Sequence, residues 1–245
     1  MHDGWIVPDW PAPAGVRSLL TSRHGGVSQG TFSSLNLGDR VGDDPRAVAE
    51  NRARVARDLP APPFWLDQVH GASVLEVGEA RRTPPEADAS VARRYGAVCA
   101  VMTADCLPVL LCSKSGKVVA AAHAGWRGLH AGVLENTLGA MHCPGSQIIA
   151  YFGPAIGPQA FEVGDEVRSA FVGANSEAKS AFSPSGPGKW LADIYLLARQ
   201  RLMRFGVDAI YGGNYCTVRE AERFFSYRRD GKTGRMAAMI WLAAD

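Results

Sequence analysis

The chain has 245 residues, 47% of them apolar, and its 26 basic and 24 acidic side chains leave a net charge of +2. It has no block of basic residues that would indicate nucleic acid or an anionic membrane as a partner, and no apolar run reaches the roughly 18 residues that a membrane-spanning helix needs. The first residues do not resemble a signal peptide, and the cysteines number five, which is odd. We therefore expect reduced thiols and a cytoplasmic protein.

In the first half of the chain, the pattern predicts one helix among several short strands. Asp44 and Pro45 are typical of an N-cap and a first helical position, and the helix is expected to run to Leu59. Apolar stretches predict strands at residues 16–20, 64–71, 73–77, 87–90 and 97–102. The strand over residues 64–71 would place His70 at its end, before a glycine.

The second half of the chain mixes helices and strands in the same way. Strands are predicted at residues 147–152, 207–211 and 236–242, and helices after residue 128, over 161–172 and over 191–205. Residues 173–189 are rich in Gly, Ser and Pro and are expected to be mobile. Because helices and strands intermingle without strict alternation and no linker divides them, we predict an α+β fold, a mixed β-sheet layered with helices, in a single domain over residues 1–245.

Residues 103–128 contain the pattern on which the function depends. Two short apolar runs, residues 107–112 and 118–122, are separated by a polar turn, which predicts a β-hairpin. Cys106 opens the first strand and His123 closes the second. Antiparallel pairing brings the start of one strand beside the end of the other, so the thiol and the imidazole are expected to meet at one edge of the sheet.

His70 has the same setting as His123, an imidazole at a strand end before a small-residue turn. His70, Cys106 and His123 together form a ligand set that suits zinc. The sequence contains no CxxC pair that would close a structural site, and three protein ligands with an open fourth position are the catalytic arrangement. Two alternatives stay open, namely a metal-free cysteine hydrolase with Cys106 as nucleophile and a binding protein with a structural zinc.

The residues after His123 predict a place for an anion. A glycine-rich turn, residues 124–128, opens the next helix and would leave backbone N–H groups free near the histidine. Arg23, beside the glycine pair Gly25-Gly26, and Arg127 are the cations that could add charge. Either arginine could equally be an ordinary surface residue.

Six strings, taken in order, resemble the YfiH family, whose members are often labelled polyphenol oxidase or laccase-domain proteins. They are TSRHGGVS, LDQVHG, TADCLPVLL, AAAHAGWRG, GPAIGP and FFSYRRDGKTGR. The resemblance runs from about Trp10 to Leu242. It implies a single-domain α+β fold with zinc held by His70, Cys106 and His123. It also implies Arg23 and Asn36 as residues of the substrate pocket.

The activity that the resemblance implies is purine nucleoside chemistry. It comprises phosphorolysis of adenosine, inosine and methylthioadenosine, and deamination of adenosine, so the expected partners are a small nucleoside and phosphate. Copper could replace zinc in a Cys/His site, but a laccase-type multicopper centre needs more histidines than the six in this chain. Asp105, beside Cys106, is the candidate for moving the proton, although it could equally cap a turn. The oligomeric state is not indicated.

Overall fold

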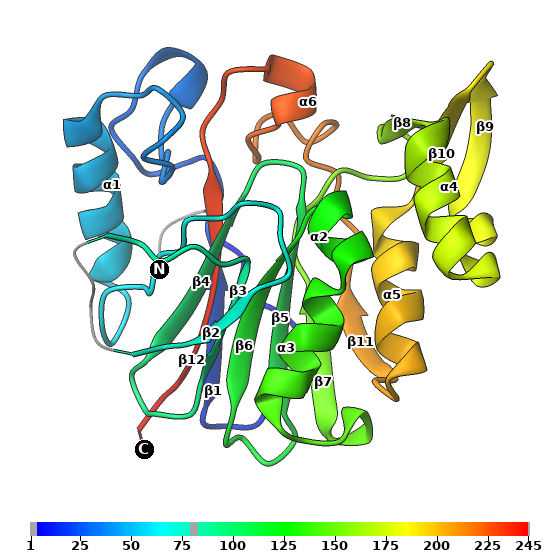
Figure 1. Ribbon diagram of the computed structural model, residues 1–245. Coiled ribbons are helices and arrows are strands. Elements are labelled where there is room, and N and C mark those ends of the chain that lie inside the picture. Colours follow the sequence, from blue (N-terminus) through cyan, green and yellow to red (C-terminus); the bar gives the residue numbers. More distant parts are fainter. Residues whose placement is uncertain (1–3, 79–82, 245) are drawn as a thin grey trace.

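Two β-sheets packed face to face form the centre of the computed structural model, which describes residues 4–78 and 83–244 (Figure 1). The smaller sheet is antiparallel, with the strand order β1-β12-β4. Its strands are β1 (Val16–Leu20), β12 (Met236–Leu242) and β4 (Val98–Thr103). The larger sheet has the order β11-β7-β5-β6-β3-β2. Its strands are β11 (Ala209–Gly212), β7 (Ile148–Phe152), β5 (Leu107–Ser113), β6 (Val119–Ala124), β3 (Ala89–Ala92) and β2 (Val74–Glu76).

Helices cover the two outer faces, with α1 on one side and α2, α3 and α5 on the other (Figure 1). These are α1 (Pro45–Ala56), α2 (Trp126–Ala131), α3 (Val133–Met141) and α5 (Ile194–Arg204). A third, small sheet of order β8-β10-β9 packs with α4. It comprises β8 (Glu162–Gly164), β10 (Lys189–Ala192), β9 (Phe182–Gly186) and α4 (Asp165–Ala174), while the short helix α6 (Tyr227–Asp230) precedes β12.

The strands at the centre are buried on both faces. Along β5, Val109 and Leu111 pack toward the helices while Leu110 and Cys112 pack against the smaller sheet. A strand covered on both sides has no solvent face to carry polar residues, so its sequence reads as an unbroken apolar run. This explains why the hairpin was visible in the sequence as two such runs.

The predicted α+β class is confirmed. The larger sheet is mixed, since β11 pairs with β7 and β2 with β3 in parallel while its other pairs are antiparallel, and one domain holds all the layers. The predicted strands at residues 16–20 and 236–242 have the bounds of β1 and β12. Asp44 caps α1 by accepting a hydrogen bond from the Arg46 N–H, as predicted. No helix among the described residues is long and apolar enough to cross a membrane.

Three predicted elements differ from the structure because pairing with distant segments, or its absence, overrides the local pattern. The helix expected over residues 161–172 begins only at Asp165, since Glu162–Gly164 pairs with β10. The stretch 173–189, expected to be mobile, holds a 3₁₀ turn and β9, and Phe182 is buried there. Residues 64–71 form isolated bridges rather than a strand. There the Gln68 side chain replaces a strand partner, bonding to both the N–H and the carbonyl of Met102.

Candidate metal centre and adjoining cavity

The side chains of His70, Cys106 and His123 come together at one end of the larger sheet. Their ligand atoms all lie within 4.8 Å of one another, and within the described part of the chain this is the one such cluster of three or more His, Cys, Asp or Glu side chains. The register of the hairpin explains the meeting, because Leu107 pairs with Ala124 and Pro108 with His123. The predicted hairpin is confirmed. His70 reaches the same place from a loop, with its Nε2 3.8 Å from the Cys106 Sγ.

Asp88 bonds to both histidines, to the ring of His123 and to the backbone of His70, and no role was assigned to it from the sequence. Its carboxylate is fully buried, and Oδ1 lies 2.8 Å from the His123 Nδ1. It also accepts hydrogen bonds from the backbone N–H groups of His70 and Gly71. With Nδ1 engaged, His123 can offer only Nε2 to a metal, which is the usual way a buried carboxylate orients a metal ligand. The sequence offered one indication of this role, because Asp88 is the single acidic residue in the otherwise small and apolar stretch 87–92.

The charges of this group support one another. Burial opposes ionisation of Cys106, but the charge of His123 and hydrogen bonds from both histidines outweigh it and hold the pKa of the thiol below its usual value. Burial would likewise lower the pKa of His123, yet the charges of Cys106 and Asp88, with their hydrogen bonds, raise it. The site therefore favours a thiolate, the form of cysteine that binds metals and attacks electrophiles.

Two glycines allow the chain to pass close to the ligands. A Cβ at Gly125 would lie 2.9 Å from the Cys106 Sγ and 2.9 Å from the His70 Cδ2. A Cβ at Gly128 would lie 2.6 Å from the Gly71 carbonyl oxygen. His70 itself has a positive φ of 61°, a conformation uncommon outside glycine. The glycine-rich turn thus serves first to make room for the cluster.

A cavity of about 520 Å³ adjoins the cluster, and all three candidate ligands line it. Its size is that of a typical small-molecule site. Apolar side chains form much of the wall, namely Val41, Leu66, Met102, Trp126, Ile156, Phe161 and Ile194. Its cations are Arg40, Arg52, Arg228 and Arg235. The last two lie in the string FFSYRRDGKTGR, but none of the four was assigned a ligand role from the sequence.

Asp105, the predicted proton carrier, also lines this cavity. It is buried, with a positive φ of 95°. Its Oδ1 accepts a 2.5 Å hydrogen bond from the Thr217 hydroxyl and its Oδ2 accepts one of 2.7 Å from the Arg228 N–H. The carboxylate therefore ties two distant segments to the loop that carries Cys106.

The other predicted binding residues, Arg23, Asn36 and Arg127, are not among the residues that line the cavity. The Arg23 guanidinium donates to the carbonyls of Ser33 and Ala221. Asn36 is fully buried in a network of backbone and side-chain hydrogen bonds. Arg127 is exposed and lies over the Trp126 ring. All three therefore lie outside the lining of this cavity, and their role in binding stays a prediction.

Comparison with known proteins agrees with this architecture. The model of a family described as multi-copper polyphenol oxidoreductase laccase matches residues 17–243. The protein YfiH of Escherichia coli, named a purine nucleoside phosphorylase, is 56% identical over 97% of this chain and 98% of its own length. The chain belongs to the YfiH family. A Pseudomonas aeruginosa member, also named a purine nucleoside phosphorylase, is 57% identical over 98% of this chain and 99% of its own.

Solved structures of YfiH-family proteins share the fold. A Neisseria meningitidis protein superposes with a TM-score of 0.97 at 54% identity, covering 99% of this chain and all of that one. YlmD from Geobacillus stearothermophilus superposes with a TM-score of 0.93 at 34% identity, covering 100% of this chain and 98% of its own. The predicted family is therefore confirmed.

The chemistry of the donor set fits a metal ion. Two imidazoles and a thiolate are ligands that zinc accepts readily, and the same set would take copper. The buried Asp88 behind His123 is the kind of partner that such ligands have. His70 is exposed, so the cluster is open to the cavity on that side.

Proposed function

We propose that this protein is a zinc-dependent purine nucleoside phosphorylase that acts on adenosine, inosine and methylthioadenosine and also deaminates adenosine. The observation that carries the proposal is the His/Cys/His cluster on the wall of a cavity sized for a nucleoside. The family supports it, because relatives that match nearly the whole chain are named purine nucleoside phosphorylases. The unpaired cysteines are consistent with a cytoplasmic enzyme.

His70, Cys106 and His123 would hold the zinc ion, which when bound supplies a Lewis acid and lowers the pKa of water toward neutrality. Asp88 fixes the ring of His123 and leaves Nε2 as its ligand atom. The apolar wall would seat the purine and exclude bulk water, which strengthens electrostatic interactions in the site.

Phosphorolysis and deamination would both use the same purine-binding site. In phosphorolysis, the bond between the ribose C1′ and the purine N9 breaks, a phosphate oxygen bonds to C1′, and the purine leaves with the electron pair and takes a proton. In deamination, water replaces the amino group at C6 and ammonia leaves. Asp105 is the candidate to carry the proton, since each of its oxygens accepts one recorded hydrogen bond and has a second lone pair.

A second candidate is a metal-free cysteine hydrolase, and one observation favours it. Cys106, His123 and Asp88 stand in the order of a nucleophile, base and orienting acid, with the His123 Nδ1 2.8 Å from the carboxylate. A metal site accounts for more of the structure, because His70 and the close contact of Gly125 with Cys106 and His70 have no part in such a triad. Copper-dependent oxidation, suggested by the family description, would arise from the same ligands binding copper.

The test is elemental analysis of protein purified without added metal, followed by assay of adenosine, inosine and methylthioadenosine with and without phosphate. About one equivalent of zinc, with free base formed only when phosphate is present, is the expected result. A chelator should stop turnover, and zinc should restore it. Full activity after complete removal of metal would favour the cysteine hydrolase instead.

A further inference from the structure

The four arginines on the cavity wall differ in what already binds them. Arg40 forms an ion pair with Asp67. Arg52 lies 3.3 Å from Asp39, with its guanidinium over the Trp65 ring. The Arg228 guanidinium donates to the carbonyls of Ala160 and Glu162.

Arg228 and Arg235 both lack a carboxylate ion-pair partner among the described residues, but Arg228 is exposed whereas Arg235 is half-buried. The recorded side-chain hydrogen bonds of Arg235 all come from Nη1, to the carbonyls of Thr233 and Gly234. The Nε and Nη2 donors have no recorded partner there. Arg235 therefore keeps a half-buried positive charge and free donor capacity on the cavity wall.

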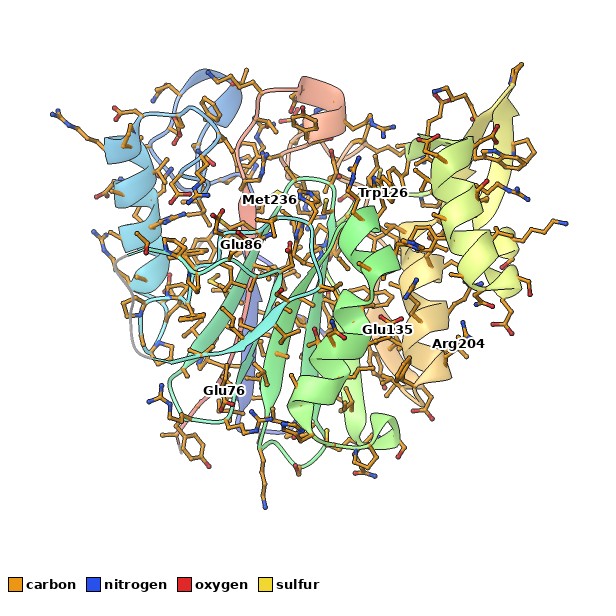
Figure 2. All side chains as sticks on the ribbon, in the orientation of Figure 1. Glu76, Glu86, Trp126, Glu135, Arg204 and Met236 are labelled. Carbon is orange, nitrogen blue, oxygen red and sulfur yellow. The ribbon has the colours of Figure 1, made fainter. Side chains whose placement is uncertain are left out.

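Strand register places this arginine beside the candidate metal centre. Met236 at the start of β12 pairs with Thr103 at the end of β4, so Arg235 stands opposite the loop that leads through Asp105 to Cys106. In Figure 2, Met236 and Trp126, the first residue of α2, lie toward the same end of the molecule. Burial lowers the pKa of Arg235, while the negative charges of Cys106 and Asp105 raise it.

Contacts with Asn36 and Gly38 restrict the position of Arg235. Its backbone N–H donates to the Asn36 Oδ1 at 2.9 Å, and the same oxygen accepts from the Gly38 N–H. A Cβ on Gly38 would lie 2.8 Å from the Arg235 Cγ, so only glycine leaves room for the stem of the side chain. Asn36 and Gly38 are thus placed to set where the guanidinium points.

We propose that Arg235 binds the phosphate that attacks the nucleoside, and that Asn36 and Gly38 are positioning residues that act through it. A guanidinium with two unused donors matches the paired oxygens of phosphate. A half-buried cation that no carboxylate pairs with directly also gains when an anion binds its free donors, because a buried charge without a direct partner is costly. This inference rests on the proposed function, and it gives Asn36 an indirect part in substrate binding.

The test compares Arg235→Gln with Arg40→Gln, which removes a cation from the same cavity whose charge is already balanced by Asp67. Since hydrogen bonds to charged groups are strong, Arg235→Gln should raise the KM for phosphate about tenfold or more, and Arg40→Gln by less than about threefold. Deamination of adenosine in phosphate-free buffer and zinc content should stay near wild type in both variants. Equal changes in the two phosphate KM values would overturn the proposal.

Gly38→Ala gives a second variant that keeps the charge but displaces it. It should raise the phosphate KM while leaving the KM for nucleoside nearly unchanged, and Arg235→Lys should recover part of the affinity lost in Arg235→Gln. An unchanged phosphate KM in Gly38→Ala would remove the positioning role.

Binding of inorganic phosphate, measured by calorimetry on the zinc-loaded proteins, separates this inference from the proposed function. Phosphate that binds wild type and Arg40→Gln but not Arg235→Gln supports the site, even if no nucleoside is cleaved. Equal binding by all three proteins would refute it. Failure of wild type to release free base from any nucleoside would instead refute the phosphorylase activity.

Discussion

The two sides of the cavity are built in different ways. The metal side is framed by β-strands, with Cys106 and His123 placed by one hairpin register and Asp88 bonded to both histidines. The adjoining part of the wall is assembled from segments that are distant in sequence, around Gly38, Tyr227 at the start of α6, and Arg235. Strand pairing fixes the positions of Cys106 and His123, whereas the position of Arg235 depends on hydrogen bonds to side chains such as Asn36. Substitutions on the metal side should therefore reduce zinc binding, whereas substitutions around Arg235 should weaken phosphate binding.

The largest effect is expected on the framed side, from Cys106→Ala. Loss of the thiolate should reduce bound zinc well below one equivalent and abolish turnover. The fold should survive, because Cys106 lies at the edge of β5 and is not fully buried. Elemental analysis and thermal unfolding against metal-free wild type check this. A variant that keeps full zinc occupancy would show that Cys106 is not a ligand.

Asp88→Ala should damage the frame itself. It leaves the His123 ring and the N–H groups of His70 and Gly71 without their acceptor, so unfolding free energy should fall by about 3–5 kcal/mol. Zinc affinity should drop by roughly 10–100-fold in protein that still folds. Asp88→Asn, which keeps one acceptor oxygen, is the control and should lie between the two. Chemical denaturation and zinc titration measure both quantities, and an Ala variant as stable as wild type would contradict the role.

Gly125→Ala tests the close approach of chain and ligands. The added Cβ would meet the Cys106 Sγ and the His70 Cδ2, so zinc affinity should fall while helix α2 still forms. Gly139→Ala is the matched control, because a Cβ there meets nothing within 4 Å, and in helix α3 it should add up to about 1 kcal/mol of stability. Equal zinc affinity in the two variants would mean that the site relaxes around the methyl group.

The smallest effect is expected from Arg23→Ala. Arg23 was predicted as a cation that could bind phosphate, but its guanidinium donates to the carbonyls of Ser33 and Ala221 and lies over the Phe225 ring. The phosphate KM should therefore change less than in Arg235→Gln, and stability should fall by about 1–3 kcal/mol as two hydrogen bonds from a charged group are lost. Phosphate saturation curves for both variants decide which arginine binds phosphate. A larger shift in Arg23→Ala would restore the original prediction.

The same difference explains which parts of the structure could be predicted from the sequence. The hairpin was predictable because Leu107 to Cys112 is buried on both faces, and its register follows from that pairing alone. Arg235 ends the string FFSYRRDGKTGR, but its place beside the metal centre was not predictable, because it comes from β12 lying beside β4, a pairing between residues more than 130 apart in sequence. Residues of β9 were predicted to be mobile because they are polar, and they form a strand only through pairing with β10.

The account rests on one metal-centred pocket performing both reactions, and His123→Ala tests this most directly. Wild-type enzyme and the variant are incubated with adenosine, with and without phosphate, and inosine and free base are followed by chromatography. Wild type should form inosine in either buffer but release free base only with phosphate, and the variant should form neither product. Undiminished formation of either product by His123→Ala would show that the His70, Cys106 and His123 cluster is not at the centre of that reaction.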